Sequence, residues 1–246
     1  MTFLTGRRVI VTGGANGIGA TVARRFAELG ARGVVLDLAT TTPPDGWHTG
    51  VVDVRDEDST RAAVADAVAA LGGVDGVVAA AGVVPTWQAP ADLDLDDFDR
   101  VMAINARGIA CTIKHTTPVL RAGAAITVVA SLNSWRGDPN ITSYAASKHA
   151  ALGIVRSAAL ALGRSGIRVN AVAPGPIATE ALRDRMTSRQ GTTGLDVEAA
   201  LHQAAESTAL GRIATAAEVA DAIAFLTSDL SSAVTGQLIN VDGGIH

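Results

Sequence analysis

The sequence predicts an α/β fold: a Rossmann-type, doubly wound parallel β-sheet of about seven strands, with helices on both faces. Three observations predict it. Short β-branched runs alternate with amphipathic helical segments along all 246 residues. No linker or internal repeat interrupts the alternation, and a glycine-rich turn follows the first strand. We therefore expect residues 1–246 to form a single domain.

The first half of the chain contains four expected strands. Three are the apolar runs 9–12, 34–36 and 77–81, and a further strand precedes Asp53 after a Thr/Pro loop. Between the strands, apolar residues recur at the three- and four-residue spacing of amphipathic helices. They are Ile18, Val22, Phe26 and Leu29 in the first helix, and Val64, Val68 and Leu71 in the next.

The second half continues the alternation. One long helix is expected to carry Phe98, Val101, Met102, Asn105 and Ile109 and to end at or before Pro118. A strand at 126–130, an alanine-rich helix and a strand at 169–172 follow. The capping-box pair Thr215 and Glu218 then predicts the start of the last helix, and 238–241 the last strand.

Composition excludes several classes of function. The formal net charge is −4 and no basic block is present, which argues against a nucleic-acid-binding surface. Cys111 is the only cysteine, so we expect no intrachain disulfide and a reducing, cytoplasmic location. Every apolar run ends well before the roughly 18 residues of a membrane span, so no membrane span is expected. No metal site is expected either.

Tyr144 and Lys148 are the most informative pair. Tyr144 is the only tyrosine and Lys148 one of two lysines, and their four-residue spacing places them on one face of the alanine-rich helix. A neighbouring cation favours the phenolate form of tyrosine, which fits it for general acid–base chemistry. The alternative is an amphipathic core tyrosine beside a solvated lysine.

A second set of residues points to a dinucleotide. Gly13, Gly17 and Gly19 lie in the turn between the first strand and helix, where the backbone can approach a pyrophosphate, although such turns also form for steric reasons alone. Asp37 ends the second strand, where a carboxylate can bind both adenosine ribose hydroxyls and repel a 2′-phosphate. Leu38 follows it, so NAD is predicted and NADP is less favoured; Arg32 is the residue that would favour phosphate binding.

These motifs occur together and in order: TGGANGIG at 12–19, Asp37, Asp53, AAAG at 79–82, NARG at 105–108, Ser131, YAASK at 144–148, PGPIAT at 174–179 and VDGG at 241–244. Over its whole length the chain closely resembles the single-domain short-chain dehydrogenase/reductase family. One departure is Ala79, where family members usually have Asn, which puts fine positioning of the cofactor loop in question. The resemblance implies these cofactor-binding residues: Gly13, Asn16, Gly17, Ile18 and Gly19 at the diphosphate, Asp37 and Leu38 at the ribose, Asp53 and Val54 at adenine, Ala80, Ala81 and Gly82 beside the adenosine, Tyr144 and Lys148, and Pro174, Ile177 and Thr179 at the nicotinamide.

The same resemblance implies the catalytic roles. Ser131 would hydrogen-bond the substrate oxygen and Tyr144 would exchange its proton. Lys148 would bind the nicotinamide ribose and favour the phenolate, while Asn105 would hold a water that links Lys148 to solvent. The implied substrate-binding residues are Ser131, Asn133, Trp135, Tyr144, Pro176 and Leu182, with Val83, Val84, Trp87 and Leu132 as further candidates. Their mixture of indole and aliphatic groups suggests a partly apolar pocket.

Residues 178–210 are predicted to form a substrate-binding lid, with Gly191 and Gly194 as hinges. Its residues Arg183, Arg185 and Arg189 would either clamp an anionic substrate or form a solvated helix face.

The favoured function is NAD-dependent interconversion of a secondary alcohol and a ketone. The alternatives are a 3-oxoacyl-thioester reductase acting on a carrier-protein or CoA substrate, and a non-enzymatic dinucleotide-sensing protein on the same fold. By resemblance we expect a homotetramer, or a homodimer, through helices near 97–117 and 144–162. The expected partner is otherwise a small-molecule alcohol or ketone, with neither nucleic acid nor membrane.

Overall fold

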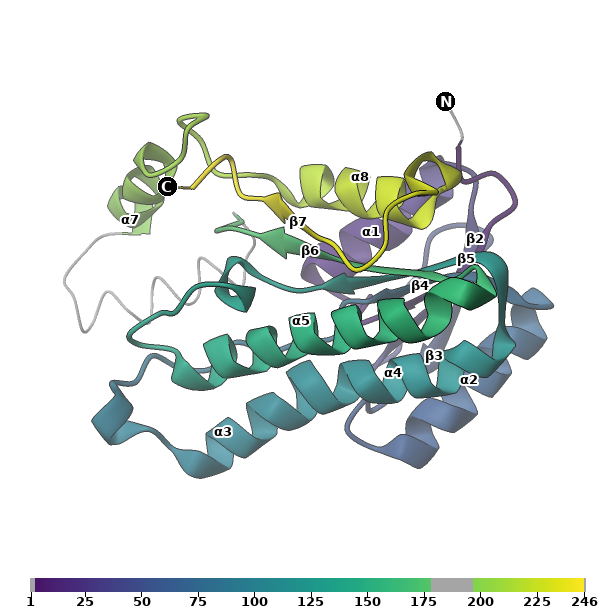
Figure 1. Ribbon diagram of the computed structural model, residues 1–246, viewed down its shortest axis with the longest axis horizontal. Coiled ribbons are helices and arrows are strands. Elements are labelled where there is room, and N and C mark those ends of the chain that lie inside the picture. Colours follow the sequence, from purple (N-terminus) through teal and green to yellow (C-terminus); the bar gives the residue numbers. More distant parts are fainter. Residues whose placement is uncertain (1–2, 178–196, 246) are drawn as a thin grey trace.

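The computed structural model describes residues 3–177 and 197–245 and places seven strands in one parallel sheet (Figure 1). Their spatial order is β3-β2-β1-β4-β5-β6-β7. The strands are β1 (Arg8–Thr12), β2 (Arg32–Asp37), β3 (His48–Val51), β4 (Val74–Ala79), β5 (Leu120–Val129), β6 (Arg168–Pro174) and β7 (Leu238–Val241). The Rossmann-type doubly wound sheet is therefore confirmed.

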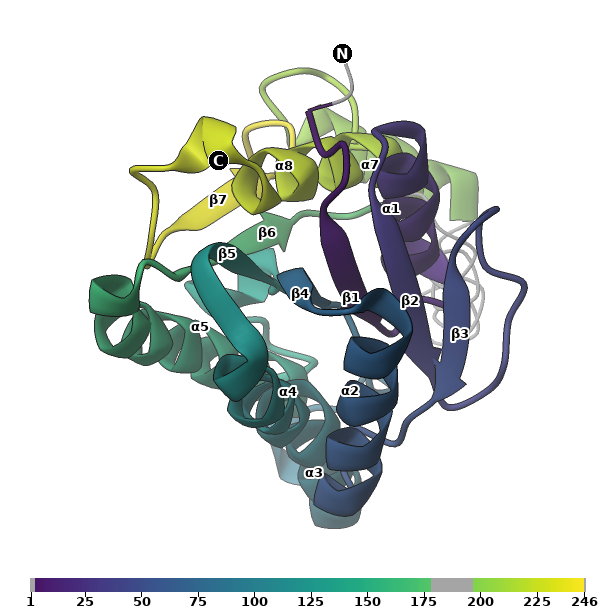
Figure 2. The same ribbon diagram turned by 90° about the vertical axis from the view of Figure 1, so that its right-hand side faces the viewer.

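Helices cover both faces of the sheet (Figure 2). The helices are α1 (Gly17–Glu28), α2 (Glu57–Leu71), α3 (Leu95–Met102), α4 (Gly108–Thr116), α5 (Thr142–Leu162), α7 (Val197–Glu206) and α8 (Ala216–Thr227). Helices α1 and α8 pack on one face, and α2, α4 and α5 on the other. The capping box predicted at Thr215 and Glu218 is present and begins α8.

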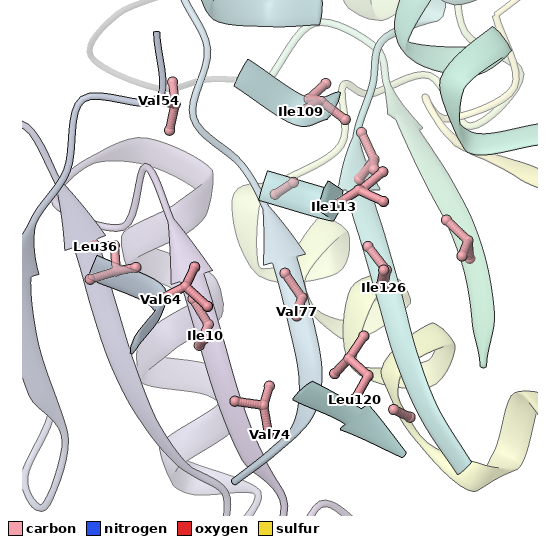
Figure 3. Close-up of a cluster of buried hydrophobic side chains, with 14 of the residues drawn as sticks. Ile10, Leu36, Val54, Val64, Val74, Val77, Ile109, Ile113, Leu120 and Ile126 are labelled. Carbon is pink, nitrogen blue, oxygen red and sulfur yellow. The ribbon is translucent and has the colours of Figure 1, made fainter. Parts of the chain in front are cut away.

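Two hydrophobic cores follow from the alternation of side chains along each strand. Ile10 of β1 belongs to the core under α2, α4 and α5 (Figure 3), whereas its neighbours Val9 and Val11 belong to the core under α1 and α8. Because both faces of the sheet are buried, its central strands are mostly apolar. The resulting slab holds the ends of the strands in fixed positions.

The long helix predicted around Asn105 differs from a regular α-helix. A π-helical turn, η2 (Ala103–Arg107), separates α3 from α4 and contains Asn105. Such a turn inserts one extra residue and is frequent at functional sites. The apolar spacing located the helix correctly but carried no sign of this turn.

The order of the strands also locates a crevice. Strand β1 pairs with β2 on one side and with β4 on the other, so the chain reverses its direction of travel across the sheet at β1. In doubly wound sheets, ligands bind beyond the carboxyl ends of the strands at this point. Within residues 3–177 and 197–245, no helix is long and apolar enough to cross a membrane.

Candidate active site

A cavity of about 1010 Å³ opens at the carboxyl ends of β1, β2, β4, β5 and β6. It brings together most of the residues predicted from the sequence, although they are far apart along the chain. The predicted residues that line it are Gly13, Asn16, Gly17, Ile18, Gly19, Asp37, Leu38, Asp53, Val54, Ala80, Ala81, Gly82, Ser131, Asn133, Tyr144, Lys148, Pro174, Pro176 and Ile177. Thr179 and Leu182 lie outside the described residues, as does most of the predicted lid.

The glycine turn between β1 and α1 is packed so closely that side chains would not fit. A Cβ on Gly19 would lie 2.1 Å from the carbonyl oxygen of Gly13, and one on Gly13 would lie 2.5 Å from Ala81. Asn16 precedes α1 but makes no side-chain hydrogen bond to the helix. The first N–H groups of α1 are therefore left without a side-chain cap at the cavity, as an anion-binding helix N-terminus requires.

Asp37 is held in place at the end of β2 by two backbone amides. Its Oδ2 accepts a hydrogen bond from Ala15 N–H at 2.9 Å, and its Oδ1 accepts one from Leu38 N–H at 2.7 Å. Each carboxylate oxygen keeps further acceptor capacity. The carboxylate thus joins the glycine turn to β2 and remains able to accept hydrogen bonds from a ribose.

The next acidic residue along this edge, Asp53, has a partner that the sequence did not reveal. Arg55 donates to both carboxylate oxygens at 2.7–3.0 Å, and this hydrogen bonding lowers the pKa of Asp53. Arg55 itself lines the cavity. Arg32, the residue considered for phosphate binding, lies at the opposite end of β2 from Asp37 and does not line the cavity, so that interpretation was wrong.

Asn105 lies behind the cavity wall and is fully buried. Its Oδ1 accepts from Val83 N–H and its Nδ2 donates to Val83 O, both at 2.8 Å. The same Nδ2 lies 3.1 Å from Ser147 Oγ, which in turn donates to the carbonyl oxygen of Tyr144. The amide therefore links the loop after β4 to helix α5, and its role in a water relay stays a prediction.

Ser131 follows β5 and begins a short turn, η4 (Leu132–Ser134). Its Oγ accepts a hydrogen bond from Asn133 N–H at 3.1 Å, and its backbone N–H donates to the buried Ser134 Oγ at 3.3 Å. A hydroxyl whose lone pair is already engaged in this way keeps its proton free to donate. Ser134 was not predicted, and only the turn geometry reveals it.

Tyr144 and Lys148 share the cavity face of α5, as their spacing predicted. Lys148 Nζ lies 5.5 Å from the centre of the Tyr144 ring. Lys148 is only 5% exposed, and its Nζ donates one hydrogen bond, 2.9 Å long, to Val129 O. An ammonium group has three donors. The remaining donors of this buried cation are available at the cavity, which fits binding to ribose hydroxyls.

The substrate side of the cavity differs in part from the prediction. Trp135 does not line it and is 48% exposed, because the turn that begins at Ser131 ends at Ser134 and carries the next residue away. Trp87, Val83, Val84 and Leu132 do line the cavity. Four further lining residues, from α7 and the residue after it, were not singled out from the sequence: Ala200, Gln203, Ala204 and Ser207. Their helical spacing was the signal that could have found them.

The absence of the usual Asn at position 79 leaves the strand pairing intact. Ala79 stays in register with Thr12 of β1 and Val128 of β5. Thr12 Oγ1 is buried and has no hydrogen-bond partner among the described residues. The register of β4 is therefore regular on both sides at Ala79, and the effect of this residue on the positioning of the cofactor loop stays a prediction.

Comparisons with known proteins identify the family. The model of the family described as enoyl-(acyl carrier protein) reductase matches residues 13–246. A (−)-isopiperitenol/(−)-carveol dehydrogenase from Mentha piperita is 43% identical over 260 residues, covering 99% of this chain and 94% of the relative. The chain belongs to the short-chain dehydrogenase/reductase family.

Two solved members of this family share its fold over nearly the whole chain. Carveol dehydrogenase from Mycobacterium avium in complex with NAD is 28% identical, with a TM-score of 0.90 over 98% of each chain. NAD⁺-bound xylitol dehydrogenase is 27% identical, with a TM-score of 0.89 over 98% of this chain and 99% of that one. Membership of the family supports an oxidoreductase that acts on alcohols and uses a nicotinamide cofactor.

Proposed function

We propose that this short-chain dehydrogenase/reductase oxidises a secondary alcohol to a ketone with NAD, and catalyses the reverse reaction. The observation that carries the proposal is the convergence of Ser131, Tyr144 and Lys148 in the cavity that also contains the glycine turn and Asp37. One face of the cavity suits a dinucleotide, and the adjoining face offers a proton acceptor and a hydrogen-bond donor.

NAD fits the residues present. The open N-terminus of α1 and the close glycine packing suit a diphosphate, and the spare donors of Lys148 suit the nicotinamide ribose. Asp37 suits a free ribose 2′-hydroxyl and opposes a 2′-phosphate. This carboxylate is the reason for preferring NAD over NADP.

The protein's own groups would manage the proton. Bound NAD would supply the hydride acceptor. Ser131 would donate its free hydroxyl proton to the alcohol oxygen and hold it beside Tyr144. Tyr144, with the ammonium group of Lys148 beside its ring, would take the alcohol proton, and it would return that proton when a ketone is reduced.

The substrate class that we propose is a mid-sized, mostly apolar cyclic alcohol of the carveol type. Trp87, Leu132 and Ile141 provide apolar surface in the cavity, and Ala200 and Ala204 leave room beside it. Two of the similar proteins are named carveol dehydrogenases. A polyol such as the xylitol of another relative would leave hydroxyl groups unpaired against these side chains.

The test is NADH formation from NAD with a panel of carveol, isopiperitenol, cyclohexanol, xylitol and a 3-hydroxyacyl thioester, with Tyr144→Phe measured alongside. We expect turnover of the cyclic terpenoid alcohols that is lost in the variant while NAD binding persists. Turnover of xylitol alone would refute the substrate class. No turnover of any alcohol or corresponding ketone would refute the dehydrogenase.

The second candidate is a 3-oxoacyl-thioester reductase. The matching family model is described as enoyl-(acyl carrier protein) reductase, a name that shares the acyl-carrier substrate, although the group that such an enzyme reduces is a carbon–carbon double bond. A 3-oxoacyl-thioester reductase would reduce the 3-oxo group of its thioester substrate faster than any terpenoid ketone, and would use NADPH at least as well as NADH. Asp37 argues against NADPH.

The dinucleotide-sensing alternative predicts NAD binding without turnover, although Ser131, Tyr144 and Lys148 are all retained.

We also propose a homotetramer in which α4 and α5 pack against a second copy. A shallow, mostly apolar groove runs between these helices, and Leu160 on α5 is exposed. The residues that line the groove are Ala110, Ile113, Lys114, Ala150, Gly153, Ile154, Ser157, Ala158 and Ala161. Analytical ultracentrifugation showing a monomer at micromolar concentration would refute this assembly.

The cellular location stays a prediction. The single buried Cys111 favours a reducing compartment such as the cytoplasm. The name of the Mentha piperita relative, however, places that enzyme in mitochondria. Cell fractionation with an antibody to this chain would decide between the two compartments.

A further inference from the structure

The VDGG motif near the C-terminus has no part in the chemistry proposed above. We infer that the turn formed by Asp242–Ile245, here called the C-terminal turn, clamps α7 in place as one wall of the substrate cavity. Its glycines would then be positioning residues for the alcohol. The inferred effect on catalysis rests on the proposed function, whereas the clamp itself can be tested without any substrate.

Helix α7 provides the wall. Ala200, Gln203 and Ala204, with Ser207 just after the helix, line the cavity at the spacing of one helical face. Helix α7 lies at the end of the molecule, away from the helices that pack on the sheet (Figure 1). Within the described residues, the segment directly after α7, residues 207–212, joins this helix to the rest of the protein.

This segment is bonded to the C-terminal turn. Ala209 N–H donates to Gly244 O at 2.9 Å, and Leu210 N–H donates to Gly243 O at 3.0 Å. Thr208 and Ile245 form an antiparallel bridge beside these two bonds. The segment after α7 is thus paired with the C-terminal turn like a short piece of sheet.

Only glycine fits the centre of this turn. Gly243 and Gly244 have φ of +73° and +79°, a region that side chains disfavour. A Cβ on Gly243 would lie 2.8 Å from the carbonyl oxygen of Arg212, and one on Gly244 would lie 2.9 Å from Ala209 Cβ. Asp242 Oδ1 accepts from Gly244 N–H at 2.9 Å and fixes the reversal of the chain.

The other end of the clamp is joined to the cavity floor. Gly175, which lines the cavity, donates its N–H to Val241 O at 3.2 Å, and a Cβ on it would lie 2.9 Å from Asp242 Cβ. The C-terminal turn therefore ties α7 to the strand ends that carry Pro174 and Ile177. None of the hydrogen bonds named above joins the C-terminal turn to the glycine turn or to α5. We therefore expect a shift of the C-terminal turn to move α7 while the glycine turn and α5 stay fixed.

The test compares Gly243→Ala with Gly236→Ala. Gly236 has the same φ of +73°, but a Cβ there would only touch Ala159 Cβ at 3.5 Å, so it reproduces the backbone strain without the collision. We expect hydrogen exchange of the α7 amides to rise at least about tenfold in Gly243→Ala only. We also expect its KM for the alcohol to rise roughly tenfold or more, with kcat at saturation and the Kd for NAD within about twofold of wild type.

Gly244→Ala provides a second variant if Gly243→Ala does not fold, because its Cβ would collide with Ala209 in the same pairing. Unchanged exchange in α7 would overturn the clamp, whatever the activity. Faster exchange with an unchanged KM would overturn its role at the substrate. If the wild-type protein oxidises no alcohol, the proposed function fails, and the exchange measurement still decides the clamp.

Discussion

The two halves of the cavity are built in different ways. The cofactor half is formed by strand ends and by the first turn of α1, where close glycine contacts and paired strands fix the backbone. The half that we propose for the substrate is formed by the turn after Ser131 and by α7, and the segment directly after α7 pairs with the C-terminal turn outside the main sheet. From this difference we expect that substrate preference can change on one side without disturbing the proposed dinucleotide site on the other.

Replacement of Lys148, the buried lysine of the cavity, should reduce kcat/KM more than any other change considered. Lys148→Met removes the donor that faces the cavity and the charge near the Tyr144 ring, so we expect kcat/KM to fall on the order of 10²–10⁴-fold. The chain's other lysine is a matched control. Lys114 lies on the surface beside Glu57, and Lys114→Met should keep normal kinetics. Steady-state NADH formation measures kcat/KM for both variants. An equal fall in kcat/KM in Lys148→Met and Lys114→Met would contradict the role proposed for Lys148.

The second-largest effect is expected from a methyl group in the glycine turn, which should weaken NAD binding. Gly19→Ala would bring a Cβ to 2.1 Å from Gly13 O, and we expect the Kd for NAD to rise on the order of 10²-fold. Gly163→Ala, at a helical position with nothing within 4 Å, is the control and should bind NAD normally. Isothermal titration calorimetry measures both constants. Normal NAD binding by Gly19→Ala would show that the turn does not hold the diphosphate.

Replacement of the ribose carboxylate should change cofactor preference. Asp37→Ser removes the repulsion of a 2′-phosphate together with acceptors for the ribose, so we expect the NAD/NADP ratio of kcat/KM to fall at least about tenfold. Asp58→Ser removes an exposed carboxylate on α2 and should leave the ratio unchanged. An unchanged ratio in Asp37→Ser would remove the basis for preferring NAD.

A larger side chain on α7 should affect the substrate half alone. Ala204→Leu places an isobutyl group in the cavity, and we expect KM for a carveol-sized alcohol to rise roughly tenfold while NAD binding is unchanged. Ala205, the next residue, does not line the cavity, so Ala205→Leu should have little effect on KM. A loss of NAD affinity in Ala204→Leu would mean that the two halves are not independent.

The smallest effect concerns stability and pH. Hydrogen bonds from Arg212 and from the backbone of Thr215 lower the pKa of Glu218 to about 2 from its usual 4.5. Because the folded-state pKa is the lower one, the stabilisation is complete above about pH 4.5 and is lost as the pH falls through about 2. Glu218→Gln should therefore unfold more easily than wild type at neutral pH in denaturant titrations. A stability difference that does not shrink in acid would contradict this origin.

The residues predicted for the cofactor half that the structure describes do meet at one cavity, and they could be located from the sequence because backbone geometry dictates their types. Gly13 and Gly19 are glycines since no side chain fits there, and Asp37 ends a strand whose apolar run is visible. Other features depend on contacts between distant residues. The π-helical turn around Asn105 is accompanied by hydrogen bonds to Val83, which lies 22 positions earlier.

The substrate half was predicted less well because it also depends on contacts between distant residues. A tryptophan in a loop carries no periodic signal for its direction, so Trp135 was assigned to the cavity, and the turn geometry shows otherwise. Ala200, Gln203 and Ala204 lay within the predicted lid but were not singled out as cavity residues. The pairing of the C-terminal turn with the segment after α7 joins residues far apart in the sequence, so no local pattern indicated it.

Transfer of hydride from the alcohol carbon is the central claim, and isotopic labelling tests it most directly. The purified protein would be incubated with NAD and carveol carrying deuterium at the carbinol carbon, and the NADH examined by mass spectrometry. The account predicts one deuterium in each NADH formed by the wild-type protein and no labelled NADH with Tyr144→Phe. NADH that forms without deuterium, or labelled NADH formed at the wild-type rate by the variant, would contradict the account.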